Sequence, residues 1–224
     1  MAKLLHIETS TTMCSVALSE NDTLIASKEI NEGYTHAENL HVFIQDLLNE
    51  TQIDTKELNA IAVSKGPGSY TGLRIGVSAA KGLAYALNIP LLSVDTLQVM
   101  SAQARTTHPG EGFFCPMLDA RRMEVYTAVY DTELNRVKAI EALIVDEHSI
   151  APFSQFPNLL FFGDGMGKCK SILSQLENAD FIEGIVPSAI DMVALAYAKF
   201  QNKAFEDVAY FEPFYLKDFL ILKK

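Results

Sequence analysis

Short apolar runs of strand length alternate with amphipathic stretches of helix length along the chain. Residues 4–9 and 14–20 are β-rich runs separated by the polar tip "STTM", which predicts a hairpin, and residues 23–30 fit a third strand. Strands and helices are mixed in both halves of the sequence, so the pattern predicts an α/β protein.

The stretch "THAENLHVFIQDLLNE" (residues 35–50) has the spacing of a helix with one apolar face. Thr35, followed three residues later by Glu38, fits a capping box at its start. The apolar stripe consists of Leu40, Phe43, Ile44, Leu47 and Leu48.

A second helix is expected behind the glycine-rich segment "KGPGSYTGLRIG" (residues 65–76). An apolar, β-branched run at 58–66 predicts a buried strand before it, and Ile89-Pro90 ends the helix near Asn88. The strand "PLLSVD" and the helix "TLQVMSAQA" then lead to "THPGEG", a loop segment. We place a lobe boundary there, between residues 1–105 and 106–224.

The second half repeats the opening pattern of the first. "FFCPMLDARRMEVYTAVYD" predicts strand, charged turn and strand, as "LLHIETSTTMCSVALSE" does at the start, which suggests an architectural duplication. "NLLFFGDGMGKCKSILSQL" follows as strand, glycine-rich turn and helix. A last helix is expected in "SAIDMVALAYAKFQN", with Ser188 as its cap.

The glycine-rich segment allows two interpretations. Its backbone N–H groups and the following helix N-terminus could cradle a phosphate, although it matches neither common phosphate-binding glycine motif. Alternatively, Gly72, Gly76, Ala80 and Ala84 fall at four-residue steps and form a ridge of minimal side chains. Because each helical glycine costs about 1 kcal/mol relative to alanine, a close neighbour must offset that cost. The neighbour could belong to this chain or to a second one.

Charge and composition narrow the function classes. The net charge is −10, from 18 Lys and Arg against 28 Asp and Glu, which disfavours stand-alone binding to a nucleic acid. The three cysteines are far apart and are expected to fill core space, as in a reducing cytosol. No apolar run reaches membrane-spanning length and no signal peptide is evident, so we expect a cytoplasmic protein.

Catalytic chemistry has little support in the residue pattern. His36 and His41 are five residues apart, which turns their rings about 140° from each other on one helix, so they cannot share an ion. No histidine accompanies a serine or cysteine in a recognisable arrangement. The charged turn that includes Arg121 and Arg122 is either a solvated hairpin tip or a contact with a partner or tRNA. Asp164 in "GDG" is expected to be a turn residue or part of a vestigial nucleotide cleft.

Several segments together resemble the bacterial TsaB family, also called YeaZ. They are "HAENL", "GPGSYTGLRIGVSAAKGLA", "LDARRMEVY", "GDG" and "PFYLK", in the family's order and spanning nearly the whole chain. The resemblance implies an actin-like ATPase fold (ASKHA, RNase H-like) with two related lobes. It also implies a role in making threonylcarbamoyladenosine in tRNAs that read ANN codons.

The resemblance implies that this chain is an accessory subunit and needs no cofactor of its own. The catalytic paralogue TsaD would carry ATP and a metal, an ATPase, TsaE, would be the third partner, and tRNA would be bound only through the complex. The alternatives are a nucleotide-dependent carbamoyl or phosphoryl transferase, or a glycoprotease-like metallopeptidase, acting alone.

Family members form homodimers through the two helices of the N-terminal lobe, here about 36–49 and 71–87. The implied interface residues are His36, Leu40, Phe43, Ile44, Leu47, Gly72, Leu73, Ile75, Gly76, Ala79, Ala80 and Leu83. A vestigial nucleotide cleft would use Glu8, Thr9, Ser10 and Asp164. Glu8 stands where the family more often has Asp, and Ala37 stands where Ser is usual.

Overall fold

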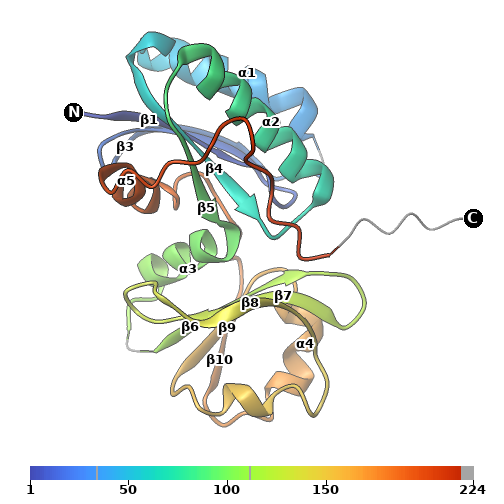
Figure 1. Cartoon of the computed structure of the whole chain (residues 1–224). Coiled ribbons are helices and arrows are strands. Elements are labelled where there is room, and N and C mark those ends of the chain that lie inside the picture. The colour runs from blue at the N-terminus through green and yellow to red at the C-terminus, as the bar shows by residue number, and fades with distance from the viewer. Residues whose placement is uncertain (34, 111, 218–224) are drawn as a thin grey trace, which may run out of the picture. The chain divides into compact units, whose positions relative to one another are not determined.

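The computed structural model describes residues 1–33, 35–110 and 112–217 and divides the chain into two compact units (Figure 1). The first unit comprises Met1–Val99 with Pro187–Phe214, and the second comprises Met100–Val186 with the chain from Tyr215. Each unit is built on a five-stranded mixed sheet.

The sheet of the first unit has the order β3-β2-β1-β4-β5. β1 (Lys3–Glu8), β2 (Cys14–Glu20) and β3 (Thr23–Ile30) form an antiparallel meander. β4 (Leu58–Gly66) pairs parallel to β1, and β5 (Leu91–Asp95) pairs parallel to β4. The predicted hairpin and the predicted strands of this half are therefore confirmed.

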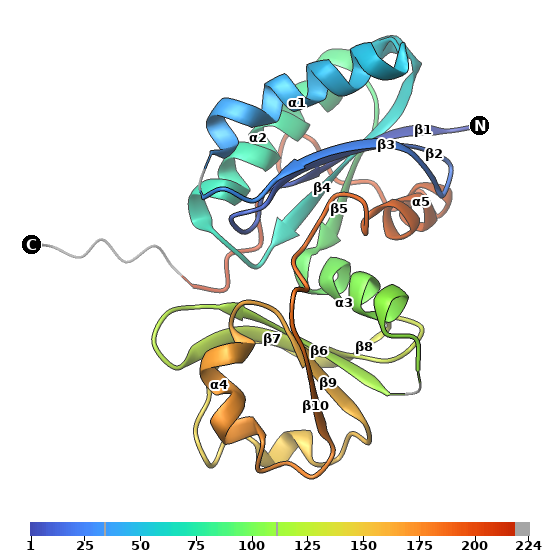
Figure 2. The ribbon, with the colours of Figure 1, turned by 180° about the vertical axis from the view of Figure 1, so that it is seen from behind.

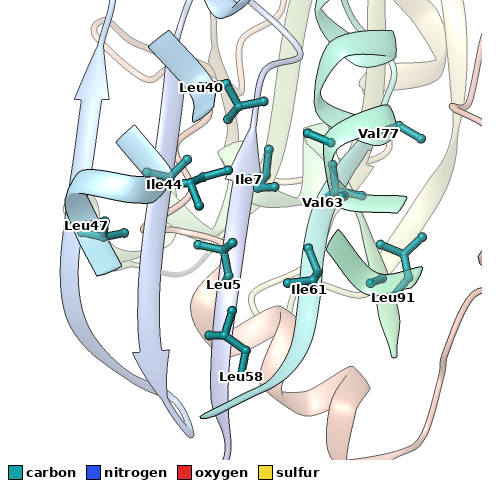
Figure 3. Packing of buried hydrophobic residues seen from close by; sticks show 14 of the residues in the cluster. Leu5, Ile7, Leu40, Ile44, Leu47, Leu58, Ile61, Val63, Val77 and Leu91 are labelled. Atoms are coloured by element: carbon teal, nitrogen blue, oxygen red, sulfur yellow. The ribbon is translucent and has the colours of Figure 1, made fainter. Parts of the chain in front are cut away.

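Helices cover both faces of this sheet (Figures 1 and 2). The face formed by Leu5, Ile61 and Val63 packs against α1 (His36–Thr51) and α2 (Tyr70–Leu87). Figure 3 shows Leu40, Ile44 and Leu47 of α1 beside the strand residues.

The opposite face consists of the alternate positions, including Leu4, Ala60 and Ala62, and packs against α5 (Val193–Gln201). Both faces are buried because residues one apart on a strand point to opposite sides. α3 (Thr96–Thr107) begins in the first unit and continues into the second.

The second unit repeats the topology of the first. Its sheet, read as β8-β7-β6-β9-β10, again has three antiparallel strands followed by two parallel ones. The predicted duplication is therefore present in the strand order. The strands are β6 (Phe113–Asp119), β7 (Glu124–Tyr130), β8 (Arg136–Ile144), β9 (Leu159–Phe162) and β10 (Ala179–Ile182).

α4 (Met166–Leu173) covers one face of this second sheet, where Cys115 and Phe161 lie in the core. Two short 3-10 turns, Thr55–Glu57 in the first unit and Ala151–Phe153 in the second, complete the regular structure of the described residues. Cys14, Cys115 and Cys169 are buried and free, as expected from their spacing. No helix in the described part of the chain is long and apolar enough to cross a membrane.

Two predicted helix starts differ from the structure. Thr35 is the N-cap residue of α1, but its side chain makes no capping hydrogen bond, so the predicted capping box is absent. A capping box does form one loop later, between Asp54 and Glu57. The last helix begins at Val193 rather than near Ser188. The Ser188 hydroxyl accepts from Ile190 N at 3.2 Å and donates to Glu29 Oε2 at 2.8 Å, so it holds the turn that precedes the helix.

The structure also divides the chain differently from the sequence analysis, which predicted a boundary after residue 105. The chain passes into the second unit at Val99–Met100, and Pro187–Phe214 returns to the first. The physical reason is α5, which lies in this returning segment and covers the second face of the first sheet.

Candidate partner-binding site

α1 and α2 lie side by side on one face of the first sheet (Figure 2). Each helix has an inner stripe packed on the strands and an outer side that faces away from them. The buried residues of α1 are His36, Leu40, Ile44 and Leu47, and those of α2 are Gly72, Leu73, Gly76, Val77, Ala79, Ala80 and Ala84.

The glycine ridge on α2 packs against the chain's own β1–β2 turn. A Cβ on Gly72 would lie 2.1 Å from the Thr9 carbonyl oxygen, and one on Gly76 would lie 2.2 Å from Thr9 Oγ1. In the loop before the helix, a Cβ on Gly68 would lie 2.2 Å from the Ser10 carbonyl oxygen. These glycines therefore admit residues 9–10 of the same chain.

This packing gives the predicted ridge a neighbour within its own unit. Gly72, Gly76 and Ala80 are buried within the first unit and cannot form an exposed surface. The inner residues of α1 belong to the same core. Of the predicted interface residues, Phe43, Ile75 and Leu83 are half-buried, and the others are buried.

An open groove does exist on the outer side of the helix pair. It has a volume of about 610 Å³ and runs between α1 and α2. The predicted interface residues Ile75, Ala79 and Leu83 line it. The remaining lining residues, which were not predicted, are Ala37, His41, Arg74, Ser78 and Gly82.

Gly82 is one of the five lining residues that sequence reasoning missed. A Cβ placed on Gly82 would meet no atom of the described chain within 4 Å beyond its immediate helix neighbours. A glycine inside a helix costs about 1 kcal/mol relative to alanine, and nothing in this unit requires the small side chain. The sequence did contain a sign of this role. Gly82 does not share the four-residue spacing of residues 72, 76, 80 and 84, so the ridge does not explain why it is a glycine.

The groove continues along α1 into a second hollow of about 380 Å³. His41 lines both, and the second hollow includes Leu48 of α1 and Ile53 of the following loop. Arg74 lies over the Tyr70 ring, with 4.5 Å from its guanidinium carbon to the ring centroid, at the α2 side of the first groove. The outer surface of the helix pair thus combines apolar, small and cationic groups.

The two histidines of α1 have different surroundings. His36 is buried, its Nε2 donates to the Thr11 carbonyl oxygen at 2.7 Å, and burial lowers its pKa despite that hydrogen bond. His41 is exposed and lines the groove. Within the described residues, no group of three or more His, Cys, Asp or Glu side chains is placed to hold a metal ion.

The predicted nucleotide residues of the first unit face inward. Glu8 is fully buried, and its Oε1 accepts hydrogen bonds from Ser10 N at 2.6 Å and Ser64 Oγ at 2.8 Å. Burial raises the pKa of this carboxyl, although the hydrogen bonds act in the opposite direction. Thr9 Oγ1 donates to the Gly72 carbonyl oxygen at 2.8 Å. Thr9 therefore binds the chain's own glycine-rich segment, and Glu8 binds the turn after β1 and the end of β4.

Asp164 belongs to the second unit and is exposed in the loop between β9 and α4. Its Oδ1 accepts a hydrogen bond from Asp119 N at 2.9 Å, which joins this loop to the end of β6. The structure therefore gives Asp164 the position of a turn residue.

Comparison with known proteins places the chain in a family. A family model described as TsaD, tRNA N6-adenosine threonylcarbamoyltransferase, matches residues 29–220. The "tRNA threonylcarbamoyladenosine biosynthesis protein TsaB" of Escherichia coli K12 is 31% identical over 99% of this chain and 97% of that protein. This chain belongs to the TsaB (YeaZ) family.

Two further comparisons agree with the family. The TsaB of Bacillus subtilis 168 is 39% identical over 57% of this chain and 54% of that protein. The solved structure of YeaZ from Pseudomonas aeruginosa is 29% identical, with a TM-score of 0.83 over 96% of this chain and all of that one. The fold is accordingly the actin-like ATPase fold with two related lobes, as the TsaB resemblance implied.

Proposed function

We propose that this chain is a non-catalytic partner subunit in the synthesis of threonylcarbamoyladenosine in tRNAs that read ANN codons. In this proposal it binds and activates a TsaD-like transferase in the cytoplasm, with a TsaE-like ATPase as third component. The observation that carries the proposal is the match to a TsaB protein over 99% of this chain and 97% of the relative.

We propose the groove between α1 and α2 as the surface that binds the transferase, and that binds a second copy of this chain in isolation. The groove supplies apolar contacts from Ile75 and Leu83 and a cation from Arg74. Exposed Gly82 lets another backbone approach α2 closely, which would offset the cost of a glycine within the helix. Protein interfaces combine such an apolar centre with a polar rim.

In the same proposal the chain requires no cofactor, and ATP and a metal are bound by the transferase. The inward orientation of Glu8 supports this assignment, because its Oε1 is already engaged by Ser10 N and Ser64 Oγ, while its Oε2 is buried without a hydrogen-bond partner among the described residues. The side chains of Thr9 and Ser10 are likewise fully buried. A phosphate group would have to displace the chain's own contacts at this turn.

Reconstitution tests the proposed function. The chain is mixed with the TsaD-like and TsaE-like proteins of its own organism, an unmodified tRNA, ATP and threonylcarbamoyl-AMP, and modified nucleoside is measured by mass spectrometry. We expect product from the complete mixture and a large loss when this chain is omitted. Equal product without this chain, or product from this chain without the transferase, would contradict the proposal.

A further inference from the structure

The turn between β6 and β7 in the second unit presents two consecutive arginines to solvent. Arg121 and Arg122 are both exposed and lie between the strand ends at Asp119 and Glu124. Their backbone φ angles are +70° and +50°. Positive φ is unfavourable for residues with a Cβ, and turns that need it normally use Gly, Asn or Asp. The turn thus keeps arginine at two positions where its backbone geometry favours other residues.

The acidic groups of this turn are paired with other cations. Asp119 forms an ion pair with Lys168 of α4, whose Nζ also donates to the Glu124 carbonyl oxygen at 2.7 Å. The Glu124 carboxylate forms an ion pair with Lys217. Within the described residues neither arginine side chain forms an ion pair or hydrogen bond, although Arg121 lies close enough to Asp119 and Tyr126 to act on them electrostatically. Both guanidinium groups therefore keep N–H donors for an anion.

The repeated topology gives this turn a counterpart in the first unit, the turn between β1 and β2. There, Thr9 and Ser10 are fully buried against the glycine-rich segment. In the second unit the equivalent turn is exposed and carries two cations. Thr9 and Ser10 are therefore buried in the first unit, whereas Arg121 and Arg122 of the equivalent turn are exposed in the second.

We propose that the Arg121–Arg122 turn binds backbone phosphates of RNA. This inference rests on the proposed function and extends it, because it gives the accessory chain a direct contact with the tRNA held by the complex. Guanidinium groups match phosphate oxygens in a bidentate geometry. An exposed hairpin end suits an extended polyanion better than a small ligand, since small-ligand sites are concave. With a net charge of −10, the chain needs a local concentration of cations at any point where RNA approaches.

The test uses the assembled complex with the transferase and ATPase and an unmodified tRNA transcript. Dissociation constants are measured by fluorescence anisotropy from 50 to 300 mM salt for wild type and for the Arg121→Ala/Arg122→Ala variant. Each lost phosphate contact should make the slope of log affinity against log salt shallower by about 0.7–0.9. Two contacts correspond to roughly tenfold weaker binding or more at 0.15 M salt. The Lys56→Ala/Lys203→Ala variant removes the same charge from exposed positions of the first unit and should leave the slope unchanged.

A second variant separates binding from structure. Arg121→Gly/Arg122→Gly relieves the unfavourable φ angles, so its melting temperature should equal or exceed that of wild type while RNA binding falls. A lower melting temperature with unchanged RNA binding would assign the arginines a structural role and overturn the proposal. An unchanged salt slope in the alanine variant would also overturn it, as would loss of complex assembly, which would indicate a protein contact.

The failure of this inference is distinguishable from failure of the proposed function. If wild type does not assemble with the transferase, the proposed function fails. The isolated chain is then crosslinked to the same transcript at 20 mM salt. Reduced crosslinking of the alanine variant relative to wild type supports the phosphate site, and equal crosslinking overturns it.

Discussion

Substituting two glycines of α2 by leucine should separate folding from association. Gly76 and Gly82 lie in the same helix, six residues apart, and both changes introduce a good helix former. The first position faces Thr9 inside the unit, and the second faces open space in the groove. Each variant is therefore the control for the other.

The expected magnitudes follow from the space at each position. At Gly76, even the Cβ would lie 2.2 Å from Thr9 Oγ1, whose hydrogen bond to the Gly72 carbonyl oxygen would be disturbed. Overpacking of this kind costs about 1–3 kcal/mol or more, against a gain of about 1 kcal/mol in helix propensity. At Gly82 the propensity gain is unopposed. About 1 kcal/mol shifts the melting temperature of a chain this size by roughly 2–4 °C.

The leucine at Gly82, which should stabilise the fold, should weaken association. A leucine at Gly82 would project into the groove and oppose a partner backbone, at a cost of about 1–3 kcal/mol. Since 1.4 kcal/mol is about a factor of ten, binding should weaken by roughly one to two powers of ten. Calorimetric melting gives the first quantity. Sedimentation of the chain alone and surface plasmon resonance with the TsaD-like partner give the second.

Two results would refute this reasoning. If Gly82→Leu melts normally and associates with both partners as wild type does, the groove is not the interface. If Gly76→Leu melts at or above the wild-type temperature, the internal packing of the ridge against Thr9 is not the reason why residue 76 is a glycine.

Three other measurements test separate parts of the structure. The isolated chain should bind ATP weakly or not at all, because its glycine-rich segment lacks a phosphate-binding lysine and is packed against its own turn; micromolar affinity with Mg²⁺ in a calorimetric titration would contradict this. Burial lowers the pKa of His6 from 6.5 to about 3, so the unfolded state alone takes up this proton as pH falls between those values. The contribution of His6 to the free energy of unfolding is therefore fully present above pH 6.5. As pH falls between these two pKa values, it decreases by about 1.4 kcal/mol per pH unit. When the free energy of unfolding is measured in urea at several pH values, His6→Gln should make its pH dependence weaker. An unchanged pH dependence would exclude His6 as its cause. Lys81 Nζ donates to the carbonyl oxygens of Phe211 at 2.8 Å and Ala209 at 3.2 Å, so Lys81→Met should speed limited proteolysis within residues 204–214. Equal cleavage rates would show that these bonds do not hold the segment.

The sequence by itself determined most of the elements of the first unit. The apolar, β-branched run at 58–66 is β4, and the stripe of residues 40–48 is the inner side of α1. Both were predictable because side-chain periodicity along a strand or helix is a local property. The repeated strand–turn–strand pattern likewise predicted the duplication, and the ordered motifs predicted the family. Strands β8 and β10 were missed, the latter with only four residues, Ala179–Ile182.

The candidate site depended on contacts that no local pattern contains. Spacing placed Gly76 on a ridge, but only the tertiary structure identified its neighbour as Thr9, 67 positions earlier, and left Gly82 in the open groove. In the same way, Glu124 in the charged turn is paired by Lys217, 93 positions later in the sequence. Helical periodicity fixes which side chains share a face, whereas what that face meets is decided by the packing of distant segments.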